Sequence, residues 1–159
     1  EDFGRGVRAL TSFDLVYDIL IVARQLPATI EFVGMFPDQS FVLNHNANPD
    51  YKSGELEPWA THMRELAGHP NVSCKASGMV SQFRDKHWPE GTFEPYLDVI
   101  FEAFGPDRVL IATDWPVCLA GANYAETMSV VLDYIADLSP SEQAAVTGDN
   151  AARVYGIEN

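Results

Sequence analysis

Basic residues are scarce in this chain, and their scarcity excludes the partners that depend on positive charge. Ten lysines and arginines stand against 23 aspartates and glutamates, which gives a formal net charge of −13 over 159 residues. Nucleic acids and anionic membranes both require a basic patch on the protein that binds them. We therefore expect neither nucleic acid nor a membrane as partner, and a small-molecule substrate remains open.

Long apolar runs, a cysteine framework and an amino-terminal signal are also lacking. The longest apolar run, residues 15–23, contains Asp18 and falls far short of the roughly 20 residues that span a bilayer. The chain opens without a methionine or a secretory signal, so we expect it to begin inside a longer gene product. Two isolated cysteines, Cys74 and Cys118, form neither a disulfide framework nor a zinc motif. Reduced thiols in a cytoplasmic protein are the expectation.

Short apolar strands alternate with amphipathic helical segments along the whole chain. Strands are expected at residues 15–22, 41–43, 71–75 and 108–113. Helices are expected at residues 25–35, 58–67, 93–104, 124–136 and 150–155, and a further one opens at Ser139 with Glu142 three positions on. Strands that alternate with helices pair in parallel through right-handed crossovers. The pattern predicts one α/β domain over residues 1–159, without repeats or linkers.

Three ionisable residues follow or end the predicted strands. His45 comes after the strand at 41–43, Lys75 ends the strand at 71–75, and Asp114 follows the strand at 108–113. In parallel α/β architectures this edge of the sheet is where ligands bind. Each residue also has a plainer interpretation: a hydrogen-bonded loop histidine, a lysine that reaches solvent, and an aspartate that favours a turn. Their coincidence at one edge nevertheless predicts a site there.

Several motifs, in chain order, resemble the amidohydrolase-related family. Residues 104–118, which read FGPDRVLIATDWPVC, are similar to the family's eighth strand, and more narrowly to the sugar lactonase branch with fuconolactone and rhamnonolactone hydrolases. Residues 41–45 followed by Pro49 resemble the sixth strand, residues 71–78 the seventh, and residues 17–21 the fifth. The resemblance implies a TIM-type (β/α)8 barrel, of which this chain carries the C-terminal half, about strands five to eight with their helices.

The family's first-strand His-x-His pair has no counterpart here, so strands one to four are missing. The segment at residues 6–10 fits the helix before strand five better than a strand. A half-barrel leaves open edges and an uncovered inner face, which favour self-association. Either the chain is a fragment of a longer protein, or it pairs with another half-barrel. In the second case the partner can be another copy of the same chain, which would form a homo-oligomer. Asn44 replaces the family's common Asp and Asn48 its usual Lys, so the substrate preference is open.

By resemblance, Asp114 is the general base that activates the attacking water. A carboxylate at a strand end beside Trp115 is partly desolvated and suited to accepting a proton. His45 and Lys75 are the candidates to stabilise the developing oxyanion of the lactone carbonyl. Trp115 and Tyr17 are candidate walls for a sugar ring, and plain core packing explains both aromatics equally well.

The resemblance also raises the question of a metal. Many amidohydrolases hold zinc or another divalent ion, whose bound water becomes the nucleophile. His45 and Asp114 would supply only two ligands, whereas catalytic zinc usually has three from protein. We predict no cofactor, with a divalent metal such as zinc in the full-length protein as the alternative.

Three functions compete on this reasoning. The first is a carboxylic-ester hydrolase that opens a sugar-acid lactone, of the L-fucono- or L-rhamnonolactone type, in carbohydrate catabolism. The second is a metal-dependent amidohydrolase or decarboxylase of the same superfamily. The third is a truncated, non-catalytic chain that binds a ligand or a partner.

Overall fold

The centre of the fold is a parallel sheet whose strands follow one another in chain order. The structure is a computed structural model that describes residues 2–157. Within that range one sheet has four strands in the order β1-β2-β3-β4, every neighbouring pair parallel. The strands are β1 (Tyr17–Ile19), β2 (Phe41–Leu43), β3 (Val72–Ala76) and β4 (Val109–Ile111). The predicted α/β class and the parallel pairing are confirmed.

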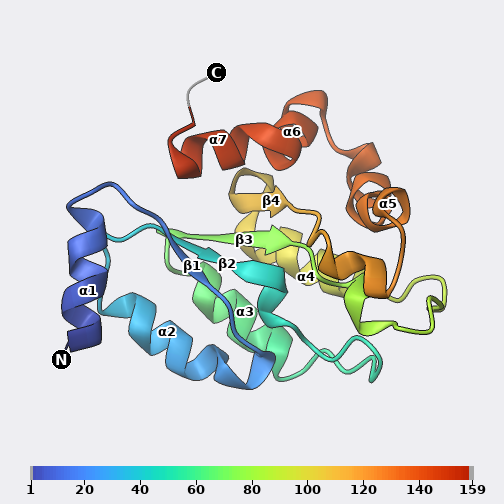
Figure 1. Ribbon diagram of the computed structural model, residues 1–159, viewed down its shortest axis with the longest axis horizontal. Helices are drawn as coiled ribbons and strands as arrows, with labels where there is room; N and C mark the ends of the chain where they lie inside the picture. The colour runs from blue at the N-terminus through green and yellow to red at the C-terminus, as the bar shows by residue number, and fades with distance from the viewer. Residues whose placement is uncertain (1, 158–159) are drawn as a thin grey trace.

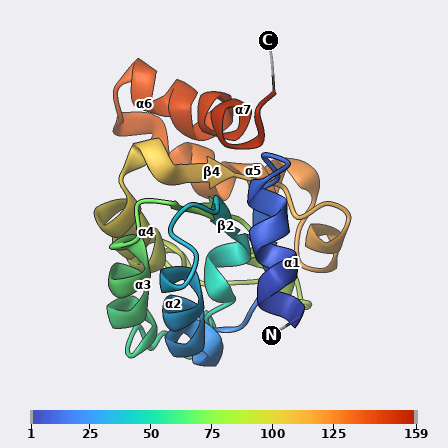
Figure 2. The same cartoon turned by 90° about the vertical axis from the view of Figure 1, so that its left-hand side faces the viewer.

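The helices lie mainly on one side of this sheet and beyond one of its edges. They are α1 (Asp2–Thr11), α2 (Leu26–Gly34), α3 (Trp59–Ala67), α4 (Glu94–Phe104), α5 (Tyr124–Tyr134), α6 (Pro140–Ala144) and α7 (Asn150–Tyr155). Helices α2, α3 and α4 pack side by side below the strands, whereas α5, α6 and α7 gather beside β4 (Figures 1 and 2). None of the helices within residues 2–157 is long and apolar enough to cross a bilayer.

The two faces of the sheet have different contents because successive strand residues point to opposite sides. Tyr17, Phe41 and Leu43 belong to the apolar core between the sheet and the helices. The alternate positions share the other face, where Asp18 lies in register with Val42, and Lys75 with Leu110. Charged side chains are thus confined to the face away from helices α2–α4.

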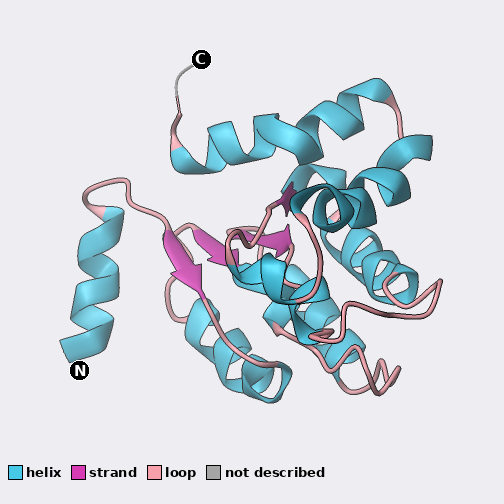
Figure 3. Cartoon of the chain, turned by 45° about the vertical axis from the view of Figure 1, so that its right-hand side comes forward, coloured by secondary structure: helices cyan, strands magenta, loops and turns pink. Residues whose placement is uncertain are grey.

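Element ends differ from the predicted ones where hydrogen-bonding partners run out. The strand expected at residues 15–22 pairs only over β1, because its neighbour β2 is three residues long and then turns. The helix expected at 124–136 ends at Tyr134 and continues as a 3-10 turn. The expected helix start at Ser139 is confirmed, since its hydroxyl accepts from the Glu142 amide and its amide donates to the Glu142 carboxylate. The strands are short compared with most of the helices (Figure 3).

Both cysteines agree with the reduced state that the sequence predicts. Cys74 on β3 and Cys118 after β4 are buried and unpaired. Burial raises the pKa of the Cys74 thiol to about 12, and a hydrogen bond with the backbone of Asn46 partly opposes this rise. A buried thiol with a raised pKa stays protonated and unreactive.

Candidate active site

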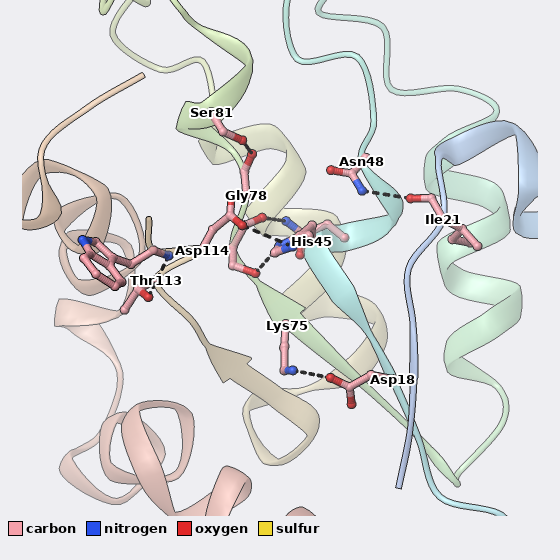
Figure 4. Close-up of polar contacts among 12 residues, drawn as sticks. Asp18, Ile21, His45, Asn48, Lys75, Gly78, Ser81, Thr113 and Asp114 are labelled. Atoms are coloured by element: carbon pink, nitrogen blue, oxygen red, sulfur yellow. Dashed lines mark hydrogen bonds and ion pairs between the residues drawn. The ribbon is translucent and has the colours of Figure 1, made fainter. Parts of the chain in front are cut away.

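His45 and Asp114 meet at the carboxyl edge of the sheet, as the strand pattern predicts. The Nε2 atom of His45 lies 3.4 Å from Oδ1 of Asp114, although 69 positions separate the residues in the chain. Both side chains are mostly shielded, with 22% and 12% of their surfaces exposed. Figure 4 shows them beside Gly78, at the ends of β2 and β4. A carboxylate that can act as a base and a ring nitrogen that can donate a hydrogen bond therefore lie next to each other, largely shielded from water.

The backbone that carries both residues is strained. His45 and Asp114 have φ of 53° and 52°, in the left-handed region that L-residues seldom occupy. Positive φ continues through Asn46, Ala47 and Asn48. Such conformations persist only where the surroundings over-determine them, and they cluster at functional sites. The strained backbone thus points to His45 and Asp114 as functional residues, the same two that their positions after strand ends indicate.

Buried hydrogen bonds hold the left-handed segment in place. The Asn46 side chain is fully buried and donates to the hydroxyl of Tyr51 at 3.0 Å. The Asn46 carbonyl accepts from the Trp59 indole at 2.8 Å. Asn48 stands where the family usually has Lys. Its side-chain amide donates to the Ile21 carbonyl at 2.9 Å and so connects this segment to the loop after β1. These bonds supply the compensation that the strained backbone needs.

Ser77 and Gly78, directly after β3, form the seat of the His45 ring. The Ser77 hydroxyl lies 2.8 Å from Nδ1 of His45. A Cβ on Gly78, whose φ is +73°, would lie 2.8 Å from two carbons of the His45 side chain, so only glycine leaves room for it. The sequence places both residues at the end of the stretch that resembles the family's seventh strand, but no local pattern there reveals their contact with His45.

A close approach of two loops fixes the segment that follows Asp114. A Cβ on Gly121 would meet the Val80 carbonyl oxygen at 1.8 Å, so the loops after β3 and β4 touch at backbone level. The Asp114 carbonyl also accepts from the Cys118 amide at 2.9 Å. The carboxylate is therefore presented by a firmly packed loop.

Burial keeps the His45 ring neutral. Loss of water around the ring lowers the pKa of His45 below its usual value, against the attraction of Asp114, and the positive charge of Lys75 adds to the lowering. A neutral imidazole carries one proton on either ring nitrogen. It can donate a hydrogen bond without carrying a charge.

Lys75 is engaged with Asp18 on the inner face of the sheet. Its Nζ lies 2.6 Å from Oδ2 of Asp18, and the hydroxyl of Tyr155 donates to Oδ1 of the same carboxylate at 2.7 Å. Burial opposes the charge, but the bonds to Asp18 and Tyr155 outweigh it and raise the pKa of Lys75. Figure 4 shows this pair further back along the strands than His45. A direct part for Lys75 in substrate binding stays a prediction.

The two predicted aromatic walls lie in different surroundings. Trp115 follows Asp114 directly and is 63% exposed, so its ring is free to contact a ligand at the rim. Tyr17 begins β1 at the opposite edge of the sheet and packs against Phe3, Phe32 and Phe41. The contacts of Tyr17 are those of core packing, the second interpretation that its sequence position left open.

A separate hollow of about 660 Å³ lies between residues 88–94 and helix α5. None of the five residues predicted from the sequence lines it. Its charged lining residues are all acidic, namely Glu90, Glu94, Glu126 and Asp133. The pairing of a strained carboxylate with a neutral histidine points to the sheet edge as the candidate site instead.

Comparison with known proteins agrees with this geometry. The amidohydrolase family model matches residues 1–157. The L-fucono-1,5-lactonase of Burkholderia multivorans is 38% identical over 169 residues, which cover 98% of this chain and 56% of that protein. The L-rhamnono-gamma-lactonase of Scheffersomyces stipitis is 26% identical, over 93% of this chain and 51% of that protein. The chain spans about half the length of the curated relatives it matches.

Solved structures show the same fold. A crystal structure of an amidohydrolase from Burkholderia multivorans with bound zinc matches with a TM-score of 0.93 at 37% identity, over 99% of this chain and 58% of that one. This agreement, together with the parallel strand order, confirms the expected part of a TIM-type barrel, corresponding to its C-terminal half.

Proposed function

The chain belongs to the amidohydrolase family, and from this membership we propose that the protein carrying it hydrolyses a sugar-acid lactone of the L-fucono- or L-rhamnonolactone type. The observation that supports the proposal most is the approach of His45 Nε2 to Asp114 Oδ1 at 3.4 Å, at the carboxyl edge of the sheet. It brings a proton acceptor and a hydrogen-bond donor to one point. The two relatives described above, both lactonases, supply the substrate class.

Asp114 acts as the general base in this proposal. It takes a proton from a water molecule, whose oxygen attacks the lactone carbonyl carbon. The carbonyl oxygen becomes an oxyanion, which a hydrogen bond from the neutral His45 ring stabilises. Collapse of this intermediate breaks the bond between the acyl carbon and the ring oxygen. The ring oxygen takes up the proton that Asp114 accepted from the water, which restores the carboxylate, and the product is the open-chain hydroxy acid.

Lys75 and Trp115 complete the proposed site. Trp115 offers a rigid apolar face to the sugar ring at the exposed rim. Lys75 contributes chiefly its positive charge, because its ammonium group is already bonded to Asp18. Tyr17, packed among core aromatics, supports the start of strand β1 in this proposal.

The described residues do not by themselves fit a metal centre. His45 Nε2 and Asp114 Oδ1 are separated by 3.4 Å, close to the roughly 3.3 Å expected between two ligands of a tetrahedral zinc ion. However, residues 2–157 contain no group of three His, Cys, Asp or Glu side chains that could hold a metal ion. A catalytic zinc takes three protein ligands. The described part of the chain thus supplies only two of the ligands that a catalytic zinc needs. Metal analysis of the intact, active protein tests the proposed reaction without metal against the metal-dependent alternative.

The setting of the enzyme is part of the proposal. The two free cysteines are consistent with a cytoplasmic protein, and the net charge of −13 disfavours nucleic acid or a membrane as partner. The chain forms the C-terminal part of a single barrel domain. Self-association through the open sheet edges stays a prediction.

Replacement of the base tests the function. In the intact protein, Asp114→Asn should reduce hydrolysis of L-fuconolactone by at least about 100-fold, because an amide cannot accept the proton of the water. The matched control is Asp14→Asn: Asp14 also has a positive φ, 53°, and it is exposed and remote from the site. Both variants should unfold at nearly the same temperature as the unaltered protein. Undiminished turnover in Asp114→Asn would remove Asp114 from the mechanism, and absence of turnover on any sugar-acid lactone by the unaltered protein would refute the function.

A further inference from the structure

We infer that Ser77 is a positioning residue, whose buried hydroxyl donates to Nδ1 of His45 and so keeps the ring proton on Nε2, facing Asp114. The hydrogen-bond partner of the Ser77 hydroxyl is the His45 ring, and Ser77 takes no direct part in the proposed reaction. The inference rests on the proposed function for its catalytic consequence. Its structural core, the proton position on His45, stands without it.

The first argument concerns the hydrogen of the Ser77 hydroxyl. Ser77 is only 3% exposed, and within residues 2–157 its Oγ has one hydrogen-bond partner, Nδ1 of His45 at 2.8 Å. If Nδ1 carried the ring proton, it would donate to Oγ, and the hydroxyl hydrogen would be buried without an acceptor. Buried donors without partners are strongly disfavoured. The hydroxyl therefore donates, and Nδ1 accepts.

The second argument comes from the other end of the ring. Nε2 lies 3.4 Å from a carboxylate oxygen of Asp114. A bare Nε2 would leave two hydrogen-bond acceptors 3.4 Å apart. Because burial lowers the pKa of His45, the ring has a single proton to place. With the proton on Nε2, both ends of the ring face complementary partners.

The proton position decides what His45 can do. A ring with hydrogen on Nε2 donates toward the space beside Asp114, where the lactone oxygen would carry the developing charge. A ring with hydrogen on Nδ1 offers only a lone pair there and cannot stabilise an oxyanion. Ser77 thus acts on the reaction through His45, in the way that a second residue commonly fixes a histidine tautomer.

Nitrogen NMR of the intact, ¹⁵N-histidine-labelled protein tests the inference directly, because protonated and bare ring nitrogens differ widely in chemical shift. The chain contains four histidines, so the His45 signals are identified by their loss in His45→Gln. The unaltered protein should show a protonated Nε2 and a bare Nδ1. In Ser77→Ala the signals should move toward a mixture of both forms, and Ser77→Thr, which keeps the hydroxyl, should restore them.

Ser81→Ala is the matched control. Ser81 lies in the same loop, and its hydroxyl donates to the Gly78 carbonyl at 2.7 Å without touching His45. Ser77→Ala should lower kcat for lactone hydrolysis by about 10- to 100-fold with little change in KM, whereas Ser81→Ala should leave kcat and the histidine signals unchanged. A proton on Nδ1 in the unaltered protein, or unchanged His45 signals in Ser77→Ala, overturns the inference. Absence of lactone hydrolysis in the unaltered protein refutes the proposed function alone, because the NMR measurement needs no substrate.

Discussion

Replacement of Gly78 by alanine is the sharpest test of how the site is held together. Gly78 has φ of +73°, and an added Cβ would lie 2.8 Å from Cβ and Cγ of His45. Carbon atoms pack at about 3.5–4.0 Å, so the ring and the new methyl group must separate by about 0.7–1.2 Å. The His45 ring is the freer of the two, and it would move out of its seat beside Asp114.

The magnitudes follow from two separate effects. Placing a Cβ at a left-handed position costs about 1–2 kcal/mol. Overpacking against His45 adds about 1–3 kcal/mol. A displacement of about 1 Å in an active site can reduce the rate by about 100-fold. Gly78→Ala should therefore lose about 2–5 kcal/mol of unfolding free energy and about 100-fold in kcat.

Gly54→Ala separates the backbone effect from the clash. Gly54 has a nearly equal φ of +71°, and a Cβ there would meet nothing within 4 Å. It should lose only about 1–2 kcal/mol of stability and retain its turnover. The assays are denaturant unfolding and lactone hydrolysis, both on the intact protein. If the two alanine variants matched in stability and in kcat, the claim that Gly78 seats the His45 ring would be refuted.

Two further predictions concern the charged groups. Because the pKa of His45 is lowered on folding, the unfolded chain binds its proton first as the pH falls below about 6.5. The free energy of unfolding should therefore decrease as the pH falls from there to the pKa of His45 in the folded protein. Denaturation measured between pH 5 and pH 8 should show a smaller dependence of this free energy on pH in His45→Gln than in the unaltered protein. An equal dependence in both proteins would contradict the lowered pKa. A double-mutant cycle with Lys75→Met and Asp18→Asn should give a coupling free energy of about 1 kcal/mol, since both side chains are partly exposed. A coupling near zero would mean that the 2.6 Å contact adds nothing to stability.

Much of the fold can be predicted from local sequence patterns. Apolar runs separated by amphipathic helices predict a parallel sheet in chain order, and the structure has that order. The Ser139–Glu142 cap depends on residues three positions apart, so the sequence alone suffices to predict it. The strand at residues 15–22 was overestimated, because the paired length depends on where the neighbouring strand β2 turns away.

The sequence by itself also determined that His45 and Asp114 share a sheet edge, because parallel strands bring all their carboxyl ends to one side. Only the tertiary structure decided how they are presented. The left-handed backbone at His45 depends on the burial of Asn46, and the ring position depends on the space above Gly78. The partner of Lys75 depends on the strand register, which sets Asp18 on the same face. These are contacts between segments tens of residues apart, and no local pattern encodes them.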